Sequence, residues 1–312
     1  MPGYYVVAAG REVIVHASGD GRVTGSVAIP VAAGNALSGV SAEPFGSADD
    51  RHFVIVVSRG GDLPGVAAVT LFQLTVSPAG RPGGLRQLSF KSNGTPVIGA
   101  ALSPDGTMLA LSLVHEFLPP LYGSVVVITL ASGATRTWSG RGAPGYWPGI
   151  PAWAGDGTVV VPWWHGTTGS MTPAEITGTR QLDAAASGAS LTAPLTPFPA
   201  PVPGLQSVML APGGGQLIAS SCHQAQHTAT ARVLELSAAN GRLVRVLRTQ
   251  TARFGNDADA ADAVFSSCRV LSVAGGGAPV LVQAFAFGRI ANGVFTPLPG
   301  ATPKVLPVSA AW

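Results

Sequence analysis

Hydrophobic and polar residues alternate in short runs along most of the chain, and tight-turn sequences separate these runs. Alternation with a period of two residues predicts strands that bury one face, and Asn-Gly, Ser-Gly or Asp-Gly pairs predict hairpins because they tolerate positive φ. Six strand–turn–strand segments have turns centred near Asp20, Arg81, Gly133, Gly188, Gly241 and Gly293. Successive centres are 61, 52, 55, 53 and 52 residues apart, which indicates one unit repeated six times.

A second hairpin precedes five of the six segments, and its clearest copy is "AALSPDGTMLALSL", Ala100 to Leu113. The first unit starts directly with its second strand, "YYVVAAG", while the chain ends with "VLPVSAAW", which matches the missing first strand. A four-stranded unit present six times and completed by the last strand predicts an all-β, six-bladed β-propeller, because ring closure removes exposed strand edges. Seven blades are the alternative.

We expect one propeller domain over residues 1–312. The expected blades cover residues 305–312 with 4–30, 36–90, 96–140, 149–198, 205–249 and 263–298. The 41 Gly and 26 Pro residues are spread along the chain at turn positions, which is typical of many short strands joined by tight turns.

Composition narrows the classes of partner. Charged residues make up only 11% of the chain, and the 18 Lys and Arg residues are scattered. A surface that binds nucleic acid needs basic residues clustered on one face, so we expect no nucleic-acid partner. No apolar run approaches the 18 or so residues of a membrane-spanning helix, so we expect no membrane insertion of this chain. The opening "MPGYYVVAAG" lacks a signal-peptide pattern, although it is compatible with removal of an N-terminal anchor.

The turns Ser103-Pro104-Asp105-Gly106 and Ala152-Trp153-Ala154-Gly155-Asp156-Gly157 resemble those of TolB-like, YVTN and WD-repeat propellers. The succession "YYVV", "DDRHFVIVVS", "LSPDGTMLAL" and "LASGATRTW" is similar to actinobacterial-type propeller domains that lie outside the membrane behind a short anchored segment. This resemblance implies an extracytoplasmic location and assigns no function. Blades five and six depart from it with Gly214 and Gly276 at the turn-aspartate position.

Candidate ligand-binding residues recur nine or ten places after the turn-aspartate position, at the end of the second strand of four successive blades. They are Arg59, His115, with Glu116 after it, His165 and His223. Loops on this face of a propeller carry ligand sites on a rigid scaffold. The residues fit either scattered loop polarity or a ring of weakly basic groups facing an anionic or polar ligand.

We expect no metal and no cofactor. Imidazole ligands must approach one zinc ion to about 2.0–2.1 Å, but the second strands lie about 4.8 Å outside the inner strands, which contain no His. The acidic segment "NDADAAD" lacks the Glu of a calcium loop, and neither "GSM" nor "SSC" is a nucleophile elbow. No catalytic residues are therefore assigned.

Five of the six Trp residues lie between Trp138 and Trp164. Tyr146 and Trp147 belong to "RGAPGYWPG", predicted to be a stiff, exposed loop on the candidate face, and Trp164 ends a second strand nearby. Two interpretations are open. The indoles either fill space between blades, which is the commoner role, or form an aromatic platform for a sugar or peptide.

Cys222 ends a second strand and Cys268 begins the next blade, so both belong near one face of adjoining blades. A disulfide requires Cα atoms about 4.4–6.8 Å apart. The extracytoplasmic location that the resemblance implies favours a disulfide over two buried thiols.

Together these features predict a monomeric, non-catalytic binding or scaffold propeller that presents its loop face to a peptide, glycan or protein partner. The alternative is a hydrolase or lyase with its site at the channel mouth. That alternative requires at least two of His115, Glu116, His165 and His223 to converge within hydrogen-bond reach.

Overall fold

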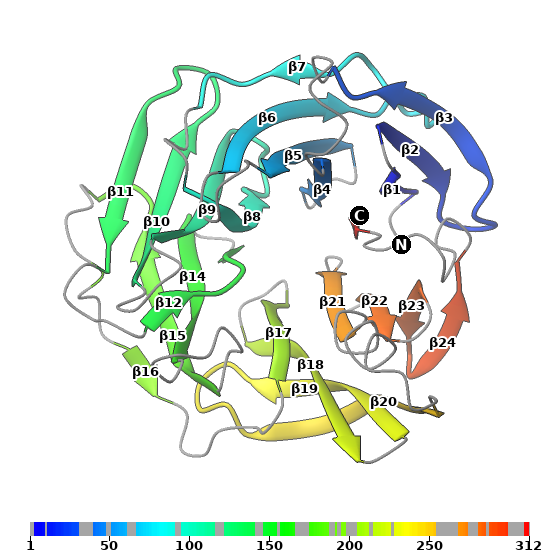
Figure 1. The fold of residues 1–312 in the computed structure, drawn as a ribbon, viewed down its shortest axis with the longest axis vertical. Helices are drawn as coiled ribbons and strands as arrows, with labels where there is room; N and C mark the ends of the chain where they lie inside the picture. The colour runs from blue at the N-terminus through cyan, green and yellow to red at the C-terminus, as the bar shows by residue number, and fades with distance from the viewer. Residues whose placement is uncertain are drawn as a thin grey trace.

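The computed structural model describes residues 3–9, 11–30, 40–47, 51–60, 67–90, 95–115, 122–140, 146–154, 157–165, 175–186, 191, 195–197, 205–211, 215–225, 228–253, 268–273, 280–284, 287–298 and 309–311. These residues form sheets arranged as a ring around a central axis (Figure 1). Within these ranges, no helix is long and apolar enough to cross a membrane.

The ring is a six-bladed β-propeller, as the repeat predicts, and the seven-blade alternative is wrong. Blade 1 contains β25 (Ser309–Ala311), β1 (Tyr4–Ala9), β2 (Glu12–Ala17) and β3 (Val23–Ala28), from the inside outwards. Blade 2 contains β4 (Val40–Gly46), β5 (His52–Gly60), β6 (Ala67–Thr75) and β7 (Arg86–Gln87). Blade 3 contains β8 (Val97–Leu102), β9 (Met108–His115), β10 (Tyr122–Thr129) and β11 (Thr135–Ser139).

The other three blades follow the same plan. Blade 4 contains β12 (Tyr146–Pro148) and β13 (Ala152–Trp153), which share the inner position, then β14 (Thr158–His165), β15 (Glu175–Asp183) and β16 (Leu195–Pro197). Blade 5 contains β17 (Leu205–Leu210), β18 (Gln216–Ala225), β19 (Thr228–Ser237) and β20 (Leu243–Arg253). Blade 6 contains β21 (Cys268–Val273), β22 (Val280–Ala284), β23 (Phe287–Ala291) and β24 (Val294–Pro297).

The C-terminal strand closes the ring, which confirms the expected closure. β25 pairs antiparallel with β1, with Ala311 opposite Val6 and Ala310 opposite Val7. The two ends of the chain therefore lie close together near the centre of Figure 1. Three strand residues are enough to complete blade 1 because Ala310 and Ala311 are both fully buried against its neighbours.

The hairpin turn in Ala100 to Leu113, the clearest copy of the repeated hairpin, is stabilised by polar side chains. Asp105 accepts hydrogen bonds from Ser103 Oγ (2.6 Å) and from Thr107 N (3.1 Å), and Gly106 takes the positive φ of 69° that the turn needs. These hydrogen bonds to the charged form hold the pKa of Asp105 below its usual value. Asp105 therefore stabilises a turn.

Blades 3 and 4 share hydrogen bonds and form one nine-stranded sheet. β12 pairs with β14 and also makes a single parallel pair with β10, where Tyr146 lies opposite Tyr122. Gly123 permits this approach because a Cβ there would overlap Pro148. The predicted loop at Tyr146 and Trp147 is thus a strand. Pro148 and the bend before β13 make the sequence of β12 look like that of a loop.

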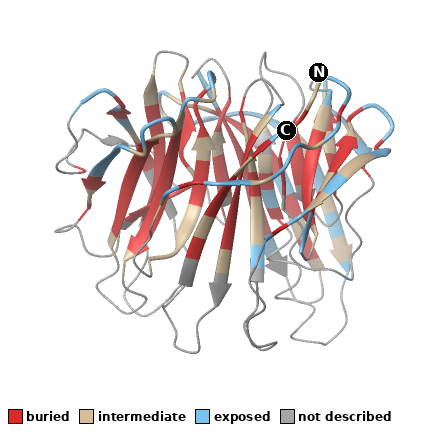
Figure 2. Ribbon diagram, turned by 90° about the horizontal axis from the view of Figure 1, so that it is seen from above, coloured by how far each residue is buried: buried red, intermediate tan, exposed pale blue. Residues whose placement is uncertain are grey.

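The core lies between neighbouring blades and consists mainly of aliphatic side chains on the strands. Figure 2 shows the buried residues running along the middle of the blades. Trp163 is the largest fully buried side chain and packs with Trp138 in the cluster between blades 3 and 4. The guanidinium carbon of Arg180 lies 4.6 Å from its ring centroid. Blade-to-blade packing therefore holds the ring rigid.

Candidate functional site

Four of the candidate residues lie at or near the ends of second strands. His115 is the last residue of β9, His165 is the last residue of β14, and Arg59 and His223 lie near the ends of β5 and β18. His223 is exposed, while His115 and His165 are half-buried. Glu116 and the side chains of Arg59 and Tyr146 lie outside the described part of the structure.

The fused sheet brings two of these histidines onto one line across five strands. His115 lies opposite Tyr122, Tyr122 opposite Tyr146, Tyr146 opposite His165, and His165 opposite Glu175. We call these five backbone positions the histidine–tyrosine row. It runs across β9, β10, β12, β14 and β15 at the end of the strands where the candidate loop face begins.

His115 is held firmly at one end of the row. Its Nε2 lies 2.7 Å from the hydroxyl of buried Ser124, and its ring stacks on Tyr122 with 5.0 Å between centroids and 14° between planes. A ring fixed at one nitrogen and on one face gives a preorganised, flat, polar surface. Tyr122 is not among the residues predicted from the sequence, although the hairpin register from His115 to the next strand could have identified it.

The row keeps the two imidazoles apart. Two strands, β10 and β12, separate β9 from β14, so the backbones of His115 and His165 lie about 14 Å apart at the usual strand spacing. His223 belongs to blade 5. His115 and His165 therefore do not form the acid–base pair that the hydrolase or lyase alternative requires.

The tryptophans of the predicted platform are packed inside. Trp147 is 8% exposed and Trp164 is 6% exposed, and both belong to a cluster with Leu205 and Leu217 of blade 5. Gly149 lies directly over the indole of Trp164, where a Cβ would collide with it. Packing between blades accounts for both positions. The prediction that Trp147 lies on an exposed loop is wrong.

A disulfide joins Cys222 and Cys268, with Cα atoms 6.2 Å apart, so the predicted pairing is confirmed. It ties β18 of blade 5 to β21 of blade 6 beside a buried hydrogen-bond network. Ser207 Oγ accepts from Val270 N (2.7 Å) and contacts Ser220 Oγ (2.8 Å), which in turn donates to Cys268 O (2.9 Å). No pattern in the sequence predicts that these serines contact each other.

The inner strands carry one ion pair that sequence reasoning missed. Arg269 on β21 lies 3.7 Å from Glu43 on β4, so the pair spans from blade 6 to blade 2 past the closing strand β25. Burial raises the pKa of Glu43, and the Arg269 guanidinium lowers it in part. The one signal in the sequence is that Glu43 is an isolated carboxylate within a predicted inner strand.

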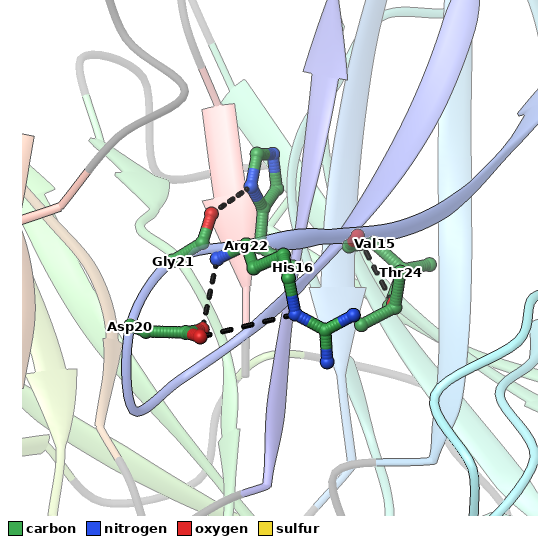
Figure 3. Close-up of polar contacts among 6 residues, drawn as sticks. All are labelled: Val15, His16, Asp20, Gly21, Arg22 and Thr24. Atoms are coloured by element: carbon green, nitrogen blue, oxygen red, sulfur yellow. Dashed lines mark hydrogen bonds and ion pairs between the residues drawn. The ribbon is translucent and has the colours of Figure 1, made fainter.

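His16, which the sequence analysis did not single out, is buried near the outer turn of blade 1 (Figure 3). Its Nδ1 lies 2.9 Å from Gly21 O, while Asp20 caps the turn by accepting from Arg22 N (3.0 Å). Its ring stacks on Tyr5 with 4.8 Å between centroids. Burial, with a smaller effect of the Asp20 charge, raises the pKa of Tyr5 to about 12.

Within the described ranges, no group of three or more His, Cys, Asp or Glu residues could hold a metal ion. In the row, the described side-chain contacts are the stack of His115 on Tyr122 and the contact of His115 with Ser124.

Comparison with known proteins assigns the chain to no family. No protein-family model matches the chain, and no curated protein matches it in sequence. Similar solved structures include a 6-phosphogluconolactonase candidate from Bacteroides uniformis, with 10% identity over 99% of this chain and 100% of that chain and a TM-score of 0.43. The β-propeller domain of the Trilobed protease from Pyrococcus furiosus is 9% identical over 83% and 71% of the two chains, with a TM-score of 0.42.

A third similar structure is puromycin hydrolase, 16% identical over 78% of this chain, with a TM-score of 0.41. The match covers only 46% of the puromycin hydrolase chain. At these identities the similarity concerns the propeller fold alone.

Proposed function

We propose that the protein is a non-catalytic binding propeller that presents the loop face at the histidine–tyrosine row to a peptide, glycan or protein partner. The observation that carries this proposal is the row itself, in which the register aligns imidazole and phenol residues across two fused blades. Planar rings with polar edges bind peptide groups and sugar rings by stacking and hydrogen bonding. The proposal concerns a site on a rigid scaffold, because the packed blades hold the strand ends in place.

The separation of the two row histidines supports binding over hydrolysis or lysis. General acid–base chemistry needs groups within about 3 Å of the reacting proton, whereas His115 and His165 are separated by two strands. A preorganised binding surface has no such requirement.

Peptide and glycan arrays test this function. We expect the wild-type protein to bind a defined subset of array members, and the His115→Ala/Tyr122→Ala variant to lose at least tenfold in affinity for them. Arg22→Ala is the control, because this exposed side chain lies at the turn between β2 and β3 of blade 1 and outside the row. Equal binding by wild type and the double variant, with both folded by circular dichroism, would remove the row from the proposal.

We further propose an extracytoplasmic location. The Cys222–Cys268 disulfide supports it, because such bonds persist mainly in oxidising compartments. Alkylation of the protein taken directly from cells, followed by mass spectrometry, tests the location. We expect no free thiol at either cysteine, and modification of both would contradict the assignment.

A further inference from the structure

The outer strand of blade 5 differs from every other outer strand in the described structure. β20 is 11 residues long, whereas β3, β7, β11, β16 and β24 have 6, 2, 5, 3 and 4 residues. It lies at the outside of the ring, in the yellow region at the bottom of Figure 1, and pairs only with β19 among the described strands. An edge strand of this length presents a row of backbone N–H and C=O groups to an incoming chain.

Exposed apolar side chains gather on the same strand. Leu243, Val244 and Val246 are 55%, 53% and 47% exposed. They are three of the five large hydrophobic residues that the described surface exposes, and the other two lie on the outer strands of blades 6 and 1. Apolar side chains concentrated on an unpaired edge are typical of sheets that accept an additional strand.

The charge on this edge has one sign. Residues 242–253 contain four of the chain's 18 basic residues and no carboxylate. Arg242, Arg245 and Arg253 are exposed, and Arg232 is exposed on the adjacent strand β19. Arg245 has an acidic partner, since its Nε lies 2.6 Å from Oε2 of buried Glu235.

Side chains of β20 also contact blade 6. The Arg248 guanidinium lies 3.5 Å from the ring centroid of Phe295 on β24, and also donates to Gln250. Leu247 and Phe295 both pack against the hydrophobic cluster between blades 5 and 6. Beside this contact is a small hollow of about 40 Å³ lined by Arg245, Leu247 and Asn292, with room for the tip of one side chain.

We propose that β20 is a docking edge for an extended, acidic peptide segment, which adds as a fifth strand to blade 5. Backbone pairing supplies the strand-to-strand contact, the arginines pair with carboxylates of the segment, and Leu243, Val244 and Val246 contact its apolar residues. A second copy of this chain is a poor occupant, because two β20 strands would bring arginines to an edge that offers no carboxylate. This edge is separate from the histidine–tyrosine row on blades 3 and 4.

The probe for this proposal is a fluorescein-labelled nine-residue peptide in which Glu alternates with Val or Thr. Fluorescence anisotropy measures its binding to the whole chain. Two matched peptides accompany it, one with Lys in place of Glu and one with N-methyl groups on every internal residue, which removes the backbone N–H donors from both edges of the peptide. We expect the acidic peptide to bind and both matched peptides to bind at least tenfold more weakly.

Charge reversal tests the location. We expect Arg242→Glu/Arg253→Glu to weaken binding of the acidic peptide at least tenfold, because both residues are exposed on the edge. Arg11→Glu/Arg22→Glu on blade 1 is the control and should change affinity less than twofold, since both residues are exposed beside a shorter outer strand. Thermal melts of both variants confirm that they fold.

Several outcomes would overturn the docking edge. Equal binding of the N-methylated peptide, or equal competition by duplex DNA, would show that charge alone attracts the probe. Unchanged affinity after charge reversal on β20 would place binding elsewhere. A dimer in sedimentation velocity that the β20 reversal dissociates would show that a second copy covers the edge. None of these results bears on the His115→Ala/Tyr122→Ala test, so the two proposals fail separately.

Discussion

Neighbouring blades are held together differently at the junction between blades 5 and 6 and at the closure at blade 1. The first joins its blades with a disulfide, a buried serine network and the contact between Arg248 and Phe295. The second depends on a three-residue strand, on buried alanines and on one ion pair that passes beside them. The ring is therefore covalent at one junction and entirely non-covalent at its closure.

Chain length makes this difference instructive. The disulfide connects residues 46 apart, whereas the closure brings Val6 to Ala311 at the other end of the chain. Loop-closure entropy grows with the logarithm of loop length, so the longer closure costs about 1.7 kcal/mol more. The closure meets this cost by burying Tyr5, Val7 and Ala310 in one cluster. Packing, with no covalent bond, thus completes the ring.

Breaking the disulfide should have the largest effect on this comparison. We expect Cys222→Ser/Cys268→Ser to lose about 4 kcal/mol of unfolding free energy, because a cross-link over a loop of this length restricts the unfolded chain by about that amount. Urea unfolding measures the loss. The double variant should be insensitive to reductant, while wild type should fall to the same stability when reduced. Equal stability of oxidised wild type and the variant would mean that the non-covalent contacts hold the junction without help from the disulfide.

At the closure, the expected effect is smaller and appears at high pH. Tyr5 is fully buried and its pKa is raised to about 12, so its contribution to stability is complete below the unfolded pKa near 10 and is lost as pH rises through 12. Two pH units correspond to about 2.7 kcal/mol. We expect Tyr5→Phe to reduce this loss of stability between pH 10 and 12, as measured by urea unfolding. Parallel pH profiles for wild type and Tyr5→Phe would show that other groups cause the loss.

The fold was predictable because propeller chemistry is local. Turn residues such as Asp105 and Gly106 repeat at a nearly constant interval, and the closing strand is visible as the element that the first unit lacks. β12 was not predictable from the sequence, because Pro148 and Gly149 are typical of a loop. Its pairing with β10 also requires that Gly123 has no side chain, since a Cβ there would overlap Pro148. A contact between two blades does not change the pattern of hydrophobic and polar residues in either blade's sequence.

The candidate site was predictable only in part, for the same reason. Strand ends follow from the repeat, so His115 and His165 were placed correctly. The pairing of His115 with Tyr122 follows from the β9–β10 hairpin, and that of His165 with Tyr146 lies within blade 4. The step from Tyr122 to Tyr146 comes from the fused sheet, which a blade-by-blade alignment does not contain. Burial of Trp147 likewise depends on Leu205 and Leu217, which lie in the next blade.

The smallest expected effect belongs to the ion pair beside the closing strand. Burial raises the pKa of Glu43 in the folded state, so the stability linked to its protonated form is complete below the unfolded pKa and is lost as pH rises through the folded pKa. We expect Arg269→Gln to destabilise the protein at pH 7 by no more than about 1 kcal/mol, because both side chains are partly exposed. The loss should be smaller at pH 4, where less of Glu43 is ionised.

Arg22→Gln is the control for this pair, because Arg22 lies at a similar distance, 3.8 Å, from Asp20, but both side chains are mostly exposed. Its effect should be near zero, since solvent screens exposed pairs. In the Glu43→Gln background, Arg269→Gln should cost the same at pH 4 and pH 7. Urea unfolding at both pH values measures the three losses of stability, which are those of Arg22→Gln, of Arg269→Gln, and of Arg269→Gln in the Glu43→Gln background. A pH-dependent cost that persists without the Glu43 carboxyl would show that Arg269 stabilises the closure through another group.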